Sequence, residues 1–170
     1  GPTAPPVNPR TLPRSGFVVK THHLPSNEKW FLNVCAHDVV DRPLSKGQRE
    51  PVDDEYLDSW CLANVDVPMH VCSRRTCTDH AGETATAIDV IFHPALIARA
   101  EVGRNVATFR DGMSVLAIAN VEKELGVRLD RKSKIIRATY KGGSGDGSAP
   151  LPIPELVEME RKQLEQLAAG

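Results

Sequence analysis

The stretch that decides the fold runs from Gly16 to Ala36 and reads GFVVKTHHLPSNEKWFLNVCA. Two short runs rich in valine, phenylalanine, tryptophan and leucine flank a polar segment that contains Pro25, Ser26 and Asn27. Apolar runs of this kind on either side of turn-forming residues are typical of two strands joined by a loop. The sequence therefore predicts a β-hairpin.

Each run of this hairpin carries one lysine at its loop end, Lys20 and Lys29. If the two lysines lie opposite each other, the alternation of side chains along a strand sorts the hairpin into two faces. One face then holds Phe17, Val19, Trp30, Leu32 and Val34. The other holds Val18, Lys20, Lys29, Phe31, Asn33 and Cys35. A slip of one residue would mix the two sets, so the hydrophobic pattern predicts that both lysines point to the same side.

Two neighbouring ammonium groups repel each other unless an anion lies between them. Lysines at strand ends are also commonly solvated, or protect a sheet edge, and this simpler interpretation stays open. An exposed ion pair contributes about 1 kcal/mol or less, so an anion site needs several cations at once. The residues that could converge with the two lysines are Arg137 and also Arg74, Arg75 and Lys141. A phosphate, with nearly two charges and three strong acceptor oxygens, suits such a group.

Length and charge set limits on the class of protein. A chain of 170 residues is expected to form one domain with at most an appendage. Its 21 lysines and arginines balance 22 aspartates and glutamates, which argues against bulk attraction to nucleic acid or to an acidic membrane. No apolar run approaches the roughly 18 residues of a membrane span, and no signal-peptide pattern is recognised.

The chain has four cysteines, Cys35, Cys61, Cys72 and Cys77, which could in principle form two disulfides. Two of them sit in apolar surroundings, and nothing in the sequence indicates secretion. Free thiols in a cytosolic protein are therefore predicted.

The remaining elements follow from turn residues and periodicity. The expected elements are a polar loop 37–52, helical turns 53–60, an extended segment 65–71, a polar loop 73–83, a strand 84–92, a short helix 95–99 after Pro94, a long helix 106–125 between Asn105 as N-cap and Gly126 as stop, and a strand 134–141. Together they predict an α+β fold, a small mixed β-sheet packed with a main C-terminal helix and short helices.

Composition divides the chain into four parts. Residues 1–15 are rich in proline and are expected to form a disordered lead-in, followed by a domain at 16–142. Residues 143–154 are expected to form a flexible, proline-rich linker, and 155–169 an amphipathic terminal helix. That helix either folds back on the domain or frays, or it begins a coiled coil or binds a partner.

Two groups of residues are candidates for chemical sites. His80 and His93 near Asp79 and Asp89 could form a catalytic group, but no nucleophile stands beside them with a positioned base. Phosphate-binding loops and nucleophile-elbow motifs are also missing from the sequence. No enzymatic activity and no cofactor are therefore expected.

The second group is His70, Cys72, Cys77 and His80, which offers enough ligands for tetrahedral zinc. Its spacing matches no common structural zinc site, and His70 and Cys72 alternate as strand residues do. A surface loop with ordinary thiols and no metal is expected.

Several segments taken together resemble the PIH domain, a name that refers to proteins interacting with heat-shock protein 90. They are Gly16–Thr21 (GFVVKT), Lys29–Cys35 (KWFLNVC), Val67–Met69 (VPM) and Ile88–Pro94 (IDVIFHP). Gly126–Arg131 (GVRLDR) and Tyr140–Gly142 (YKG) are most similar to the Kintoun-type branch, the cytoplasmic assembly factors of axonemal dynein arms. The resemblance covers residues 16–142.

This resemblance implies an α+β domain that reads acidic phosphoserine peptides. The two lysines of the family motifs are here Lys20 and Lys29, and a basic residue on the last strand, here Arg137, would assist. Arg74 or Lys141 would meet flanking acidic residues. The implied protein is a cytoplasmic co-chaperone adaptor of the cilium that links clients to heat-shock protein 90 with its TPR and RuvB-like ATPase co-chaperones. It would bind neither nucleic acid nor membrane.

A different class of function also remains open. The chain could be a structural interaction scaffold that works through apolar surface and its terminal helix, with a vestigial phosphate site.

Overall fold

A computed structural model of the chain describes residues 6–58 and 64–170. The first five residues of the expected lead-in, the last two of the expected helical turns 53–60, and Cys61 lie outside the described residues. In chain order the elements are the 3-10 turn η1 (Pro9–Thr11), β1 (Arg14–Leu24), β2 (Lys29–Ala36), β3 (Leu44–Ser45), α1 (Asp54–Asp58), β4 (Val65–Asp66), β5 (His70–Val71), β6 (Arg75–Thr78), β7 (Thr84–Phe92), α2 (Pro94–Glu101), α3 (Val106–Leu125), β8 (Arg128–Leu129), β9 (Lys134–Ile136) and α4 (Pro154–Ala169).

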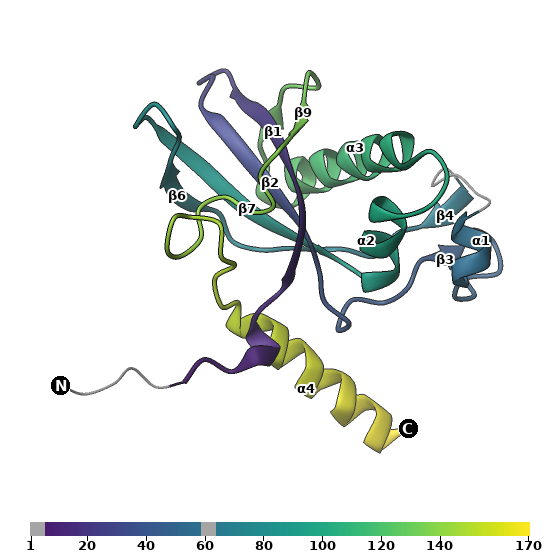
Figure 1. The fold of residues 1–170 in the computed structure, drawn as a ribbon. Coiled ribbons are helices and arrows are strands. Elements are labelled where there is room, and N and C mark those ends of the chain that lie inside the picture. The colour runs from purple at the N-terminus through teal and green to yellow at the C-terminus, as the bar shows by residue number, and fades with distance from the viewer. Residues whose placement is uncertain (1–5, 59–63) are drawn as a thin grey trace.

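Among the described residues, seven strands form one mixed sheet in the order β5-β7-β2-β1-β8 (Figure 1). β6 also pairs with β7, and β9 also pairs with β1. The central pair, β2 and β7, is parallel, whereas the other pairs are antiparallel. Strands β3 and β4 form a separate two-stranded sheet beside α1. The expected α+β fold with a mixed sheet is confirmed.

Both faces of the sheet are covered. Helices α2 and α3 pack on the face that carries Trp30, Leu32 and Val34, where the largest apolar cluster lies. The opposite face carries a second cluster, built from the sheet and the C-terminal segment, whose buried members are Cys35, Val39, Val40, Cys72, Ile91, Tyr140, Ile153 and Leu156. A third cluster of Val18, Phe31 and Ala85 continues on that face. The hairpin is therefore a central layer, which explains why both of its faces contain apolar residues.

The hairpin forms, but with a register two residues away from the expected one. Lys20 pairs with Phe31, and Lys29 pairs with His22. The strand β1 continues beyond Thr21, and His23 closes the turn by donating its N–H to the carbonyl of Glu28 at 2.9 Å. A shift of two residues keeps every side chain on its face because the period of a strand is two. The expected pairing of the lysines is wrong, whereas their expected placement on one face is confirmed.

Three other expectations need correction. Residues 75–78, expected in a polar loop, form the strand β6, which pairs with the start of β7. The expected strand 134–141 ends at Ile136, because the chain then leaves β1 and carries Tyr140 to a hydrogen bond with Asp89. Asn105 has a left-handed backbone (φ 52°) and makes no capping bond with its side chain. Gly126 stops α3 as predicted, with φ 63° and its N–H bonded to the carbonyl of Glu122.

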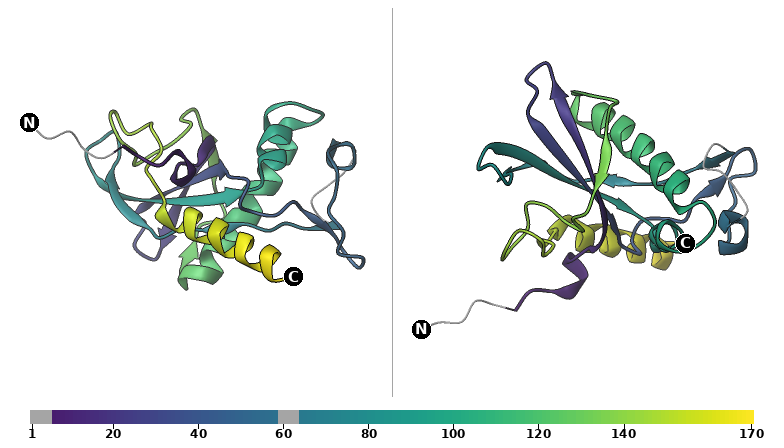
Figure 2. Two further views of the ribbon diagram at one scale, coloured as in Figure 1. Left: turned by 90° about the horizontal axis from the view of Figure 1, so that it is seen from below. Right: turned by 45° about the horizontal axis from the view of Figure 1, so that its top comes forward.

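The C-terminal helix α4 lies on the side of the sheet away from α2 and α3, next to η1 (Figures 1 and 2). Ile153 donates its N–H to the carbonyl of Thr11 at 2.7 Å, and Gln163 Nε2 donates to the carbonyl of Val39 at 2.7 Å. The other end of the helix presents Leu164 and Leu167 to solvent, with 61% and 77% exposed. The helix therefore docks along the stretch up to Gln163, and its last turn faces solvent.

The segment between the sheet and α4 passes through a tight turn. Gly143 and Ser144 donate their N–H groups to the carbonyls of Gly147 and Ala149. A Cβ atom on Gly143 would lie 2.0 Å from the carbonyl oxygen of Ala149, so glycine is required at this position.

The boundaries expected for the linker and the lead-in remain predictions.

The described cysteines Cys35, Cys72 and Cys77 carry free thiols, as expected. No helix among residues 6–58 and 64–170 is long and apolar enough to cross a membrane.

Candidate functional site: a lysine cluster on the sheet

Three strands bring lysines together on one face of the sheet. Lys20 of β1 pairs with Phe31 of β2 on one side and with Lys134 of β9 on the other. Lys29 lies two residues before Phe31 on β2, so it shares the same face. The two lysines singled out from the sequence are therefore neighbours, and Lys134 joins them. No local pattern in the sequence points to Lys134, because its position in the cluster depends on which strand β9 joins.

The charges of this cluster act on one another. Partial burial lowers the pKa of Lys20, and the positive charges of Lys134 and Lys29 lower it further. Within the described part of the chain, Lys20 makes no hydrogen bond or ion pair with a carboxylate. A cation held next to other cations gains from any anion that comes between them.

Lys29 differs from Lys20 because it already has an anionic partner. Its Nζ atom lies 2.9 Å from Oδ2 of Asp79, in the turn between β6 and β7. The Asp79 side chain is 3% exposed, and its Oδ1 accepts hydrogen bonds from the N–H groups of Ala81 and Glu83. A ligand anion would have to share Lys29 with Asp79 or displace it.

The contact between Lys29 and Asp79 favours the charged form of both groups. The hydrogen bond to Asp79 raises the pKa of Lys29, and the same bond, with the N–H groups of the turn, lowers the pKa of Asp79. Whatever stability the pair contributes is therefore lost as the pH falls through the lowered pKa of Asp79. It is also lost as the pH rises through the raised pKa of Lys29.

Lys141 extends the cluster from the C-terminal segment. Its Nζ atom lies 5.5 Å from the centre of the Phe31 ring and 3.1 Å from Nε2 of His80. Its backbone N–H and carbonyl are both hydrogen-bonded to the side chain of Asn33, at 2.9 Å each. Because Phe31 pairs with Lys20, Lys141 lies on the same face of the sheet as the other three lysines. We use the name lysine cluster for Lys20, Lys29, Lys134 and Lys141.

Of the two arginines expected at the site, Arg74 lies on the opposite face of the sheet. Arg74 lies over the ring of Trp30, 5.9 Å from its centre, and Trp30 belongs to the opposite face of the sheet. Arg137 is exposed, follows the last residue of β9, and contacts no described acidic residue. The structure therefore brings Lys141 to the two motif lysines and leaves Arg74 apart from them.

Below the lysine cluster, a buried polar network joins the most characteristic sequence motifs. Asp89, with no exposed surface, accepts hydrogen bonds from Asn33 (2.9 Å) and from the Tyr140 hydroxyl (2.6 Å), and forms an ion pair with Arg75 (3.1 Å). Burial by itself would lower the pKa of Arg75, but the bonds to Asp89 and Tyr140 outweigh it, and the pKa is raised. These motif residues therefore hold the C-terminal segment, and with it Lys141, against the sheet.

The candidate catalytic group is not assembled at one place. Asp89 belongs to the buried network, whereas His93 caps helix α2 by accepting the N–H of Ala95 at Nδ1 (3.0 Å). Asp79 and His80 lie in the turn after β6. These positions give no pairing of a nucleophile with a base.

The four residues considered as zinc ligands, His70, Cys72, Cys77 and His80, do not lie at one place either. His70 pairs with Ile91 of β7, while Cys77 pairs with Ala85 near the start of the same strand. Six residues of strand separate these positions by roughly 20 Å, at about 3.3 Å per residue. Cys77 and His80 therefore cannot share a metal ion with His70 and Cys72.

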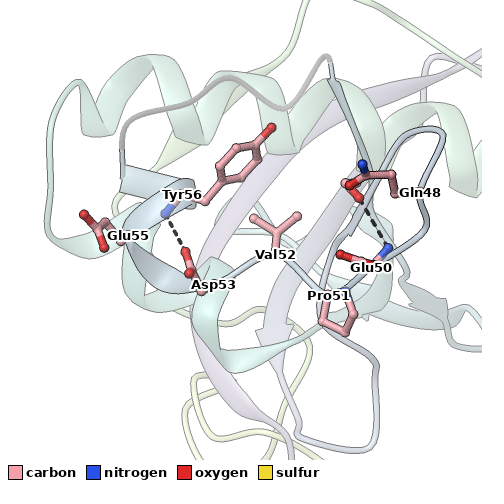
Figure 3. Close-up of a pocket in the computed structure, with 8 residues that line it drawn as sticks. Gln48, Glu50, Pro51, Val52, Asp53, Glu55 and Tyr56 are labelled. Atoms are coloured by element: carbon pink, nitrogen blue, oxygen red, sulfur yellow. Dashed lines mark hydrogen bonds between the residues drawn. The ribbon is translucent and has the colours of Figure 1, made fainter.

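A hollow on another part of the surface lies between β3 and α1 (Figure 3). Its lining includes Glu50, Asp53 and Glu55, together with Tyr56, and Asp53 Oδ1 accepts the N–H of Tyr56 at 2.8 Å. Such an acidic lining repels anions, so this pocket is unsuited to a phosphate.

Comparison with known proteins places these features in context. Residues 10–146 match the family model described as the PIH1 N-terminal domain. The chain is 30% identical over 149 residues to Protein kintoun of Rattus norvegicus, covering 87% of this chain and 17% of the relative. For Protein kintoun of Homo sapiens the identity is 30% over 150 residues, covering 85% and 16%.

The solved structure of the N-terminal domain of yeast PIH1p has a similar fold. The TM-score is 0.60 at 18% identity, and the match covers 84% of this chain and 90% of that one. The chain spans about one-sixth of the length of the kintoun relatives that it matches.

Proposed function

The chain belongs to the PIH1 N-terminal domain family, and from this premise we propose that it is a non-enzymatic adaptor domain that binds an acidic phosphoserine peptide at its lysine cluster. Through this peptide it links a client to the heat-shock protein 90 machinery, with TPR and RuvB-like ATPase co-chaperones, in the cytoplasm. The process served is the preassembly of axonemal dynein arms. The resemblance described above, which the family match bears out, supports this assignment.

The observation that carries the proposal is the convergence of lysines from three strands and the C-terminal segment on one face. Lys20 pairs with a strand on each side and has a lowered pKa; it makes no hydrogen bond or ion pair with a described carboxylate, and the charge of Asp79 only partly offsets the neighbouring lysines. A phosphate between Lys20 and Lys29 would accept charge-assisted hydrogen bonds from both, and Lys134 and Lys141 would attract the acidic residues that flank it.

We expect charge reversal at the two motif lysines to abolish most of this binding. A fluorescent peptide with one phosphoserine among aspartates is titrated against wild type and the double variant Lys20→Glu plus Lys29→Glu. The double variant should bind at least about 30-fold more weakly, a loss of about 2 kcal/mol, because two charge-assisted bonds are replaced by repulsion. Wild-type binding should also weaken with added salt, since the cluster is at the surface.

The matched control is Lys162→Glu, an exposed lysine of α4 outside the cluster, which should leave the affinity unchanged. The neutral variant Lys20→Gln plus Lys29→Gln guards against misfolding caused by charge reversal, and circular dichroism checks the fold. Equal binding by wild type and both double variants, or equal binding of the unphosphorylated peptide, would refute the proposal.

The contact between Lys29 and Asp79 predicts that one variant binds the peptide more tightly than wild type. Asp79→Asn keeps an oxygen for the N–H groups of Ala81 and Glu83 but removes the charge that competes with the phosphate. The same titration should show tighter binding, by up to about fivefold, since the Lys29 end of the pair is one-third exposed and an ion pair in contact with solvent competes only weakly. Weaker binding by Asp79→Asn would mean that Lys29 does not meet the phosphate.

The alternative, a scaffold that works through its terminal helix, has one observation in its favour, the exposed Leu164 and Leu167 at the end of α4. Deleting the whole helix would also remove the buried side chain of Leu156, so the double variant Leu164→Asp plus Leu167→Asp separates the two functions better. A peptide reader should keep its affinity in this variant. A helix-dependent scaffold should lose its partner.

A further inference from the structure

Three potential metal ligands meet where helix α4 crosses the end of strand β5. They are His70 of β5, Cys72 just after it, and Glu155 in the first turn of α4. Their donor atoms, an imidazole nitrogen, a thiol sulfur and a carboxylate oxygen, all lie within 4.8 Å of one another. Residues 70 and 72 share a face because side chains alternate along an extended chain.

The imidazole at this place has a buried nitrogen that faces a carboxylate without a hydrogen bond. Nε2 of His70 is buried and makes no hydrogen bond, although it lies 3.2 Å from Oε2 of Glu155. Buried polar atoms are nearly always satisfied, and here the contact with the Glu155 carboxylate leaves the nitrogen without a hydrogen bond. A metal ion is a suitable partner, since neutral imidazole nitrogen is among the commonest metal ligands in proteins.

We propose that His70, Cys72 and Glu155 bind a zinc ion that joins helix α4 to the sheet. One nitrogen, one sulfur and one carboxylate oxygen form a borderline-soft donor set, which suits Zn²⁺ and disfavours Mg²⁺ and Ca²⁺. Zinc bonds of about 2.0–2.3 Å place tetrahedral donors roughly 3.3–3.8 Å apart, so side-chain shifts of about 1 Å close the site. On binding, the Cys72 thiol gives its proton to solvent and its sulfur bonds to the metal.

The surroundings favour a site that is partly closed. Cys72 is 5% exposed, and its N–H is bonded to the carbonyl of Asp89, so the strand holds the sulfur in place. The His70 and Glu155 side chains are 28% and 44% exposed, which leaves a route for the ion and room for a water as fourth ligand. Because Glu155 lies next to buried Leu156, the metal would strengthen the attachment of α4 that the apolar contact begins.

Titration of the full chain with Co²⁺, after treatment with a chelator, tests this site. Wild type should take up one equivalent and develop a thiolate-to-cobalt charge-transfer band together with the visible bands of tetrahedral cobalt. Zn²⁺ should abolish these bands by displacement and should raise the thermal midpoint. Cys72→Ser should lose the charge-transfer band, and Glu155→Gln should weaken binding by at least about tenfold, since even outer-shell partners are worth 10- to 100-fold.

The matched control is Cys77→Ser, which removes a half-buried thiol of β6 outside the site and should keep the full spectrum. Because Cys72 is buried, the partly exposed Glu155→Gln serves as the variant that leaves the fold intact. The proposal is overturned if wild type shows no thiolate band. A band that survives Cys72→Ser, or zinc stabilisation that is undiminished in Glu155→Gln, overturns it as well.

Discussion

Replacing Asp89 by alanine is expected to destabilise the domain by about 3–5 kcal/mol, the cost of removing one partner from a buried ion pair. Asp89 is fully buried and holds three side chains, those of Asn33, Arg75 and Tyr140. Without the carboxylate, a partly buried guanidinium and two polar groups lose their partner. The loss is a large share of the 5–15 kcal/mol that stabilises a typical domain.

Chemical denaturation followed by tryptophan fluorescence measures this loss. The control is Asp111→Ala, an exposed aspartate of α3, whose effect should stay within about 0.5 kcal/mol. If the Asp89 variant does not fold, Tyr140→Phe, which removes one of the three bonds, should still cost about 1–3 kcal/mol. Equal midpoints for Asp89→Ala and Asp111→Ala would contradict the network.

The second large loss of stability is expected from a substitution in the first turn of helix α4. Leu156 has no exposed surface and packs in the second apolar cluster with Tyr140, Ile153 and Cys35. Leu156→Ala should lower the free energy of unfolding by about 2–5 kcal/mol, through lost burial and the cavity left behind. It should also release the helix, which hydrogen exchange of its backbone amides would detect.

The same helix supplies the matched control. Leu167 is 77% exposed, so Leu167→Ala should change stability by no more than about 0.5 kcal/mol. A loss at Leu167 as large as that at Leu156 would mean that α4 packs through a different face.

The candidate site was predicted in part, and the missing part has a clear cause. The two faces of the hairpin follow from alternation alone, so Lys20 and Lys29 were placed together although their register was two residues away from the expected one. Lys134 was missed because nothing near it in the sequence says that β9 pairs with β1 beside Lys20. Arg74 lies over Trp30 on the opposite face, because the strand β6 begins at the next residue and side chains alternate there, whereas a polar loop was expected over 73–83.

Elements with local signals were predicted correctly, whereas contacts between distant segments were not predicted. The bounds of α3 and β7 agree with those expected, because a long helical period ended by glycine and a run rich in β-branched residues are local signals. The ion pair between Lys29 and Asp79 and the contact of His70, Cys72 and Glu155 join residues that lie far apart in the chain. Neither could be read from spacing.

The sequence by itself determined the family, the strand faces, the main helix and the two motif lysines, because each depends on residues that are neighbours along the chain. Only the tertiary structure decided which cations meet, which carboxylate already holds Lys29, and which part of α4 is buried. The physical reason is that charges and ligands act through space, over a few ångströms. The strand pairings that set those distances are made between segments that no local pattern connects.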